Sequence, residues 1–177
     1  MKIVISGGAA SGKSAHAERI LCRHSQPDSR LYVATMQPFG KNAEMRIARH
    51  RALRRGKGFD TAERYTDLEH FRAEKQYSGI LLECMYNLLA NEMFAPEGAG
   101  VQAMELILRG VAALEQQCDV LVIVTNEIFS DGEIYPAETM QYMEQLGGIN
   151  RALFRQADAA AESVCGILVP YKGESLL

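Results

Sequence analysis

The sequence predicts a single α/β domain with a mostly parallel sheet covered by helices on both faces. Short apolar runs alternate along the chain with segments of helical length, and this alternation is typical of a parallel sheet with crossover helices. The strongest run, residues 119–125, is almost entirely apolar, which favours a central strand buried on both faces. The chain has 177 residues, of which 47% are hydrophobic, so residues 1–177 are expected to form one globular domain.

The first half of the chain is predicted to contain three strands and two long helices. Runs of β-branched and aromatic residues predict strands at 2–6, 31–35 and, more weakly, 59–64. A glycine-rich turn separates the first strand from helix-forming residues at 15–21. Residues 41–55 are predicted to form a surface helix, because its apolar stripe is thin and most other positions are charged.

The second half continues the alternation of strand and helix. Strands are predicted at 79–83, 119–125 and 163–170, and helices at 67–75, 85–94, 102–117 and 137–161. The last of these helices is expected to be interrupted near Gly147 and Gly148, because glycine destabilises a helix interior.

Composition and charge exclude several classes of function. The net charge of −3 argues against general nucleic-acid binding, and no apolar run approaches the length of a membrane span. The chain begins with a strand rather than a leader, and its four cysteines and four histidines show no disulfide or zinc-ligand spacing. We therefore expect a cytoplasmic protein with no structural metal and no nucleic-acid or membrane partner.

The glycine-rich turn matches the phosphate-binding P-loop pattern G-x-x-x-x-G-K-S. Its glycines allow successive backbone N–H groups to point at a phosphate, and the helix that follows adds the positive end of its dipole. Lys13 is predicted to contact the β- and γ-phosphates, and Ser14 is predicted to ligate Mg²⁺. The motif indicates a P-loop NTPase fold of the RecA-like type. The residues assigned to the phosphates are Gly7, Gly8, Ala9, Ala10, Ser11, Gly12, Lys13 and Ser14.

Polar residues follow three of the other predicted strands at the point where each strand ends. They are Thr35, Glu83, and the pair Asn126 and Glu127. Ligands of open α/β sheets bind at this edge, so we expect these side chains to converge on the nucleotide. A carboxylate there commonly holds Mg²⁺, which makes Glu83 a second candidate metal ligand beside Ser14. The alternative for Glu83 is a purely structural acid at a helix N-terminus.

The predicted helix at 41–55 carries a dense set of basic residues around a histidine. Arg46, His50 and Arg54 are four positions apart and share one face, and Arg49 and Arg51 widen the stripe. Arginines bind phosphates with a planar fork, and a positive field lowers the pKa of a histidine and so favours its neutral, nucleophilic form. The alternatives are a solvated basic face and an RNA-binding helix, although interleaved aromatic residues are lacking.

The order of these motifs resembles the bifunctional adenosylcobinamide kinase / adenosylcobinamide-phosphate guanylyltransferase family. The matching segments extend over the whole chain and are more selective together than the P-loop alone. They are the P-loop region at 6–18, Y-V-A-T at 32–35, R-I-A-R-H-R at 46–51, T-A-E at 61–63, L-L-E-C at 81–84, V-T-N-E at 124–127 and G-G-I-N-R at 147–151.

The resemblance implies two reactions in cobalamin nucleotide-loop assembly. In the first, ATP or GTP phosphorylates the terminal hydroxyl of the aminopropanol arm of adenosylcobinamide. In the second, GMP is transferred from GTP to that phosphate with release of pyrophosphate. The resemblance also implies that His50 becomes guanylylated, that Glu63 and Glu83 contact the nucleotide or the metal, and that the protein forms a homo-oligomer, commonly a trimer. Lys13 is the second candidate catalytic residue, because its P-loop position places an ammonium on the phosphates.

Two further interpretations of the sequence stay open. Residues 128–136 and 140–144 depart from the glycine-rich loop and arginine-rich helix of many relatives, so a guanylyltransferase with weak or lost kinase activity is one alternative. A non-catalytic P-loop nucleotide-binding protein is the other, but such a protein has no use for an arginine-flanked histidine.

Overall fold

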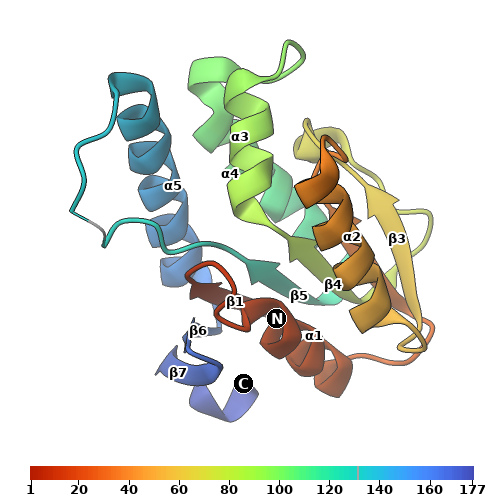
Figure 1. Ribbon diagram of the computed structural model, residues 1–177. Helices are drawn as coiled ribbons and strands as arrows, with labels where there is room; N and C mark the ends of the chain where they lie inside the picture. Colours follow the sequence, from red (N-terminus) through yellow and green to blue (C-terminus); the bar gives the residue numbers. More distant parts are fainter. Residues whose placement is uncertain (131) are drawn as a thin grey trace.

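The computed structural model describes residues 1–130 and 132–177, with Asn42 described by its backbone alone. The strands of these residues form a seven-stranded sheet in the order β3-β2-β4-β5-β1-β6-β7 (Figure 1). Neighbouring strands are parallel except β6 and β7, which pair antiparallel. The strands are β1 Lys2–Gly7, β2 Arg30–Ala34, β3 Phe59–Glu63, β4 Tyr77–Glu83, β5 Cys118–Val124, β6 Ala159–Val164 and β7 Ile167–Lys172.

Helices cover both faces of the sheet, as predicted. Helix α1 packs on one face, whereas α3, α4 and α5 pack on the opposite face (Figure 1). The α-helices in the described residues are α1 Lys13–His24, α2 Lys41–Arg54, α3 Met85–Phe94, α4 Ala103–Glu115 and α5 Ala137–Gln156. Short 3-10 turns lie at Leu68–His70, Gly100–Gln102 and Glu174–Leu176. In the described part of the chain, no helix is both long enough and apolar enough to cross a membrane.

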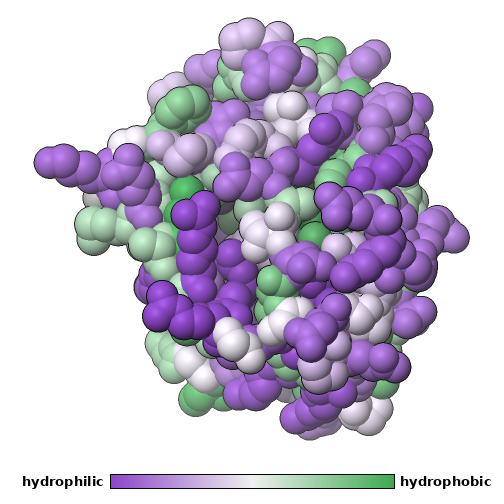
Figure 2. All heavy atoms as spheres, turned by 90° about the vertical axis from the view of Figure 1, so that its right-hand side faces the viewer, coloured by the Kyte–Doolittle hydropathy of each residue, from purple (hydrophilic) through white to green (hydrophobic). Residues whose placement is uncertain are grey.

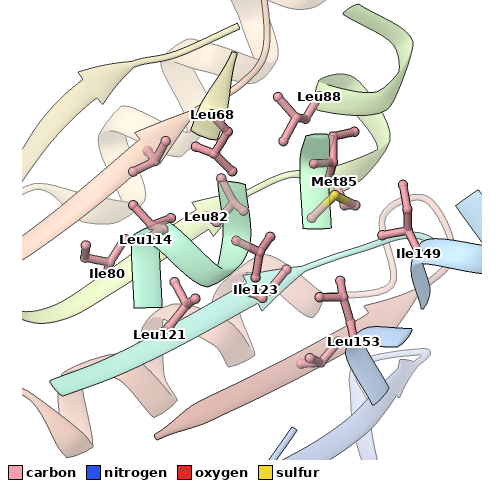
Figure 3. Packing of buried hydrophobic residues seen from close by; sticks show 14 of the residues in the cluster. Leu68, Ile80, Leu82, Met85, Leu88, Leu114, Leu121, Ile123, Ile149 and Leu153 are labelled. Carbon is pink, nitrogen blue, oxygen red and sulfur yellow. The ribbon is translucent and has the colours of Figure 1, made fainter. Parts of the chain in front are cut away.

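The central strands are buried because their side chains alternate between two apolar clusters. On β4, Leu82 points to the cluster under α3, α4 and α5, while Leu81 points to the cluster under α1. Figure 3 shows Leu82, Leu121 and Ile123 from the sheet meeting Met85, Leu114 and Ile149 from the helices. Each fully buried side chain of this kind stabilises the fold by about 1.5–3 kcal/mol. The predicted central position of the strand near 119–125 is confirmed, since β5 lies in the middle of the sheet.

Two predictions for the C-terminal region are wrong. Helix α5 runs without interruption through Gly147 and Gly148, and the reason is packing: a Cβ on Gly148 would lie 2.7 Å from the sulfur of Met104 on α4. The predicted last strand at 163–170 is instead a hairpin of β6 and β7, turned at Cys165 and Gly166 with φ angles of 50° and 82°.

The predicted helix at 67–75 is also wrong, since only the 3-10 turn Leu68–His70 is formed there. The segment has one strongly buried anchor, Leu68, and α4 approaches it closely because Gly110 has no side chain. A Cβ at Gly110 would lie 2.8 Å from Leu68 Cβ. A longer helix needs a broader apolar face than this polar segment offers.

Helix α2 is held to the domain mainly by polar side chains. Among its described side chains, none belongs to either apolar cluster, and the two buried ones are His50 and Arg54. Figure 2 shows the face of the molecule on the side of α2 and β3, and this face is hydrophilic over most of its area. The prediction of a thinly packed surface helix is therefore confirmed.

Candidate active site

The P-loop joins the end of β1 to the start of α1. Gly12 occupies the N-cap with φ 96°, a conformation that glycine adopts without strain, and it has no side chain to cap the first N–H groups of α1. These N–H groups are available to a phosphate. Close packing requires the first glycine as well, because a Cβ on Gly7 would lie 2.6 Å from the carbonyl oxygen of Ser163.

Lys13 lies inside this loop, where Nζ donates a hydrogen bond of 2.8 Å to the carbonyl of Gly8. Burial lowers the pKa of Lys13, and the guanidinium groups of Arg46 and Arg49 lower it further. The carboxylate of Glu83 acts in the opposite direction. The site thus concentrates positive charge in a partly desolvated place, which suits a polyanionic ligand.

A cavity of about 750 Å³ opens next to the P-loop. Its volume lies in the range of small-molecule sites. Most of the residues predicted for the nucleotide line it, together with apolar side chains from neighbouring elements. The predicted residues in its wall are Ala9, Ala10, Ser11, Gly12, Lys13, Ser14, Arg46, Arg49, His50, Arg51, Glu63, Glu83 and Asn126.

Glu83, the last residue of β4, is the point where the polar groups of the cavity meet. The hydroxyl of Ser14 donates a hydrogen bond to Oε1, and the phenol of Tyr32 donates one of 3.2 Å to Oε2. Burial by itself would raise the pKa of Glu83, but the neighbouring His50 imidazole and the Ser14 and Tyr32 hydroxyls outweigh it, so the pKa lies below the usual value. Glu83 is therefore an ionised carboxylate at neutral pH, even though it is buried.

The donor set beside the P-loop suits a hard divalent cation. Ser14 Oγ and Glu83 Oε1 are in direct contact, and both are oxygen ligands of the kind that Mg²⁺ accepts. In nucleotide sites Mg²⁺ takes only one or two protein oxygens and completes its shell with phosphates and water. No group of three or more His, Cys, Asp and Glu side chains fit to hold a metal occurs among the described residues, so a site of this kind would depend on the nucleotide.

Helix α2 carries His50 to the same carboxylate. The side chain of His50 is buried, and its Nδ1 lies 3.4 Å from Glu83 Oε1. The sequence predicts a histidine flanked by arginines, and the structure adds a carboxylate to these neighbours. Nδ1 is the ring nitrogen of His50 that faces Glu83.

The other basic residues of α2 are arranged around the mouth of the cavity. Arg46 and Arg49 are exposed and line the cavity. Arg51 lies 3.4 Å from Glu63 in an exposed ion pair between α2 and the end of β3. Glu63 also accepts a hydrogen bond of 2.7 Å from the hydroxyl of Tyr65. The arginines can thus move to a bound polyphosphate without losing a buried partner.

Sequence reasoning missed the pair formed by Tyr32 and Arg54. The guanidinium of Arg54 lies 3.4 Å from the centroid of the Tyr32 ring, and both side chains are buried walls of the cavity. Burial raises the pKa of Tyr32, with Glu83 adding to the effect, so the phenol remains a hydrogen-bond donor. Arg54 was visible in the sequence as the third member of the Arg46–His50–Arg54 face. Tyr32 resembled any other apolar strand residue.

Four predicted site residues are not among those that line the cavity, namely Gly7 and Gly8 at the start of the P-loop, and Thr35 and Glu127. Thr35 is fully buried, and its hydroxyl donates to the carbonyl of Cys84 and accepts from the Cys84 N–H, both at 2.8 Å. The carboxylate of Glu127 accepts hydrogen bonds of 2.8 Å from the N–H of Phe129 and the hydroxyl of Ser130. Thr35 and Glu127 therefore hold backbone segments beside the site in place. Thr35 orders the turn after Glu83, and Glu127 orders the loop after β5.

Asn126 and Cys84 are the chain neighbours of Glu127 and Glu83. Asn126 lines the cavity, and its backbone is held by Asn150 on α5, whose side-chain amide donates to the Asn126 carbonyl at 3.1 Å. Burial raises the pKa of the Cys84 thiol to about 11, so Cys84 is a neutral thiol and a poor nucleophile at pH 7. His50 is the better candidate for covalent chemistry.

The fold and this site define the class of protein. A P-loop between β1 and α1, a carboxylate at the end of β4 and strand β5 between them make this a P-loop nucleotide-binding α/β protein. Solved structures agree on the fold. FlaH, a flagellar accessory protein of Methanocaldococcus jannaschii, superimposes with a TM-score of 0.50 at 13% identity, over 97% of this chain and 77% of that one. An ATPase of a bacterial type III secretion system superimposes with a TM-score of 0.55 at 9% identity, over 96% of this chain and 56% of that one.

The family follows from the sequence comparisons. The family model described as cobinamide kinase / cobinamide phosphate guanyltransferase matches residues 3–171, and the chain belongs to this family. A bifunctional adenosylcobalamin biosynthesis protein of Escherichia coli, CobU, is 31% identical over 97% of this chain and its own full length. The corresponding CobP of Pseudomonas aeruginosa is 28% identical over 99% of this chain and its full length. The predicted family and the P-loop fold are thus confirmed.

Proposed function

We propose that this protein phosphorylates adenosylcobinamide and then transfers GMP from GTP to adenosylcobinamide phosphate. The observation that carries the proposal is the position of His50, which is buried beside the P-loop with Nδ1 3.4 Å from Glu83. Family membership supplies the substrate class. A phosphate cradle alone serves a kinase, whereas a buried histidine in the same cavity also serves a nucleotidyl transfer through a covalent intermediate.

In the guanylyl transfer, the lone pair of His50 Nε2 attacks the α-phosphorus of GTP. The bond from that phosphorus to the bridging oxygen of the β-phosphate breaks, and pyrophosphate leaves with the electron pair. The ionised Glu83 faces Nδ1 and balances the positive charge that develops on the ring. An oxygen of the substrate phosphate then attacks the same phosphorus and releases the imidazole. The exposed Arg46 and Arg49 offset the charge of the leaving pyrophosphate.

In the kinase reaction, the hydroxyl of adenosylcobinamide attacks the γ-phosphorus of ATP or GTP. The N–H groups at the start of α1 and the ammonium of Lys13 hold the triphosphate, and they stabilise the charge that spreads over the transferred group. Mg²⁺, when bound, neutralises part of the phosphate charge, and Ser14 and Glu83 are the residues that would hold it.

Labelling with GTP tests the assignment of His50. Incubation with GTP labelled at the α-phosphate should leave an acid-labile, base-stable label on the wild-type protein, and none on His50→Ala. His70→Ala is the matched control, because His70 is exposed and contacts Asp67 rather than the cavity. Equal labelling of His50→Ala and wild type would exclude the mechanism. Labelling without phosphorylation of adenosylcobinamide by ATP or GTP would select the alternative of a guanylyltransferase that lacks kinase activity.

A further inference from the structure

The turn between β6 and β7 packs directly against the P-loop. Residues Cys165 and Gly166 both have positive φ angles, and Val164 pairs with Ile167 across them, so the turn is a tight two-residue hairpin connection. The contact is close, since a Cβ on Gly12 would lie 3.5 Å from Cα of Gly166. The hairpin is thus an immediate neighbour of the phosphate cradle, although it lies at the far end of the chain.

Two donors from this hairpin hold one carbonyl of the P-loop. The hydroxyl of Ser163 donates a hydrogen bond of 2.7 Å to the Ser11 carbonyl, and the N–H of Gly166 donates one of 2.9 Å to the same oxygen. Ser163 is almost completely buried, so its hydroxyl has no competition from solvent. In a trans peptide the C=O of one residue and the N–H of the next point in opposite directions. When the Ser11 carbonyl is held toward the hairpin, the Gly12 N–H points away from the hairpin, and Gly12 lines the cavity beside the P-loop.

His16 on α1 holds the hairpin turn from the other side. Its Nε2 lies 3.0 Å from the carbonyl of Gly166, and its Nδ1 lies 2.7 Å from Nη2 of Arg19. A guanidinium only donates hydrogen bonds, so Nδ1 must accept and Nε2 must carry the proton that it donates to Gly166. The peptide groups of Gly166 are therefore fixed at both ends, by the P-loop and by α1.

We propose that Ser163 is a positioning residue for the phosphate site, and that His16 supports it through Gly166. Together they fix the Ser11–Gly12 peptide so that the Gly12 N–H is already aimed at a phosphate before the ligand arrives. The proposal rests on the nucleotide-binding half of the proposed function, and it is independent of the chemistry at His50. It concerns any ligand that carries a polyphosphate, because the cradle recognises phosphate oxygens rather than a base.

Binding measurements on the full chain test this role. In Ser163→Ala the Kd for inorganic tripolyphosphate and for GTP should rise about fivefold, the usual effect of losing one hydrogen bond. Ser78→Ala is the matched control. The Ser78 hydroxyl also donates to a backbone carbonyl, that of Ser29 at 2.8 Å, but at the opposite end of the sheet. This control should lose comparable thermal stability and keep the wild-type Kd.

A second pair of variants keeps the test decisive if Ser163→Ala folds poorly. His16→Gln retains an N–H donor for Gly166 and should keep most of the affinity for tripolyphosphate, whereas His16→Phe should lose severalfold. Wild-type Kd values in both Ser163→Ala and His16→Phe, with only the melting temperature reduced, would show that the hairpin merely stabilises the fold. Failure of the wild type to bind tripolyphosphate or GTP would overturn the nucleotide site itself. If the wild type binds both ligands but takes up no label on His50, only the proposed chemistry is refuted, because the role of Ser163 is tested by the Kd values.

Discussion

Glu83 is the residue on which the proposed chemistry depends most. It lies at the end of a buried strand, where the hydroxyls of Ser14 and Tyr32 donate to its two oxygens and His50 faces one of them. A buried carboxylate without such partners would be protonated and unable to bind a cation. These contacts keep Glu83 ionised, so that one side chain serves both the P-loop and the histidine.

The lowered pKa of Glu83 predicts a specific pH dependence of stability. Because its pKa in the folded state lies below the unfolded value of about 4.3, ionised Glu83 contributes stability above that pH. The contribution is lost as pH falls through the folded-state pKa. The difference in unfolding free energy between wild type and Glu83→Gln should therefore shrink as pH falls from about 6 to about 3. Denaturant titrations across this range measure it, and a difference that does not change with pH would contradict the assignment.

At the scale of secondary-structure elements, α2 differs from the other helices in how it is attached. The other long helices bury apolar faces in the core, whereas α2 is anchored by His50 against Glu83 and by Arg54 over Tyr32. A desolvated cation–π contact contributes about 2 kcal/mol. The position of α2, and of His50 with it, therefore depends on a small number of polar contacts.

Replacing the buried arginine should loosen α2 and leave the remaining fold intact. In Arg54→Ala the amides of α2 should exchange with deuterium about tenfold faster, since loss of the contact to Tyr32 removes on the order of 1–2 kcal/mol of local stability. The amides of α1 should be unaffected. Arg55→Ala is the control, because Arg55 is the adjacent residue and is exposed. Equal exchange in the two variants would show that Arg54 does not anchor the helix.

Two glycines inside helices should respond in opposite ways to alanine. A Cβ on Gly110 in α4 would lie 2.9 Å from the backbone nitrogen of Glu69, so Gly110→Ala should destabilise the protein by about 1–3 kcal/mol. A Cβ on Gly147 in α5 meets only Phe129 at 3.8 Å, so Gly147→Ala should stabilise by roughly 0.5–1 kcal/mol through helix propensity. Urea unfolding measures the change in unfolding free energy for each variant. A change of the same sign in both variants would refute the packing argument.

At the scale of the whole molecule, the candidate active site is assembled at one edge of the sheet. The P-loop follows β1, Glu83 ends β4, and Asn126 follows β5, and parallel strands bring such residues to the same edge. The site therefore joins segments that are distant in the chain. Binding at this edge should stabilise the entire fold.

Nucleotide binding should raise the melting temperature in a way that depends on the metal. GTP with Mg²⁺ at a concentration of about 100 times Kd should add about 2.7 kcal/mol of unfolding free energy. A chelator should reduce this gain, and Ser14→Ala should show a smaller gain with Mg²⁺ than the wild type. Lys13→Ala serves as the control that binds little nucleotide. If a chelator does not change the stabilisation by GTP, Ser14 and Glu83 are excluded as ligands of a nucleotide-bound metal.

Much of the architecture could be predicted, and the failures have physical causes. The strands near 119–125 and 79–83 were predicted correctly because apolar runs of this kind are local signals. The predicted interruption of α5 was wrong because the close contact of Gly148 with Met104 of α4 offsets the poor helix propensity of glycine. The C-terminal hairpin was missed because its turn is formed by Cys165 and Gly166, a pair that is not a strong turn signal.

The sequence by itself determined where the P-loop motif lies and to which family the chain belongs, because the P-loop is a contiguous pattern and the order of the motifs along the chain is selective for the family. It also determined that His50 belongs to a basic helix face. Only the tertiary structure decided that Ser14 and His50 share Glu83, and that the C-terminal hairpin supports Ser11. The contacts of Ser14 with Glu83 and of Ser11 with Ser163 span 69 and 152 positions. The periodicity of the sequence indicates on which face of a helix or strand a residue lies. Its contact partner from a distant part of the chain is determined by the order of the strands in the sheet.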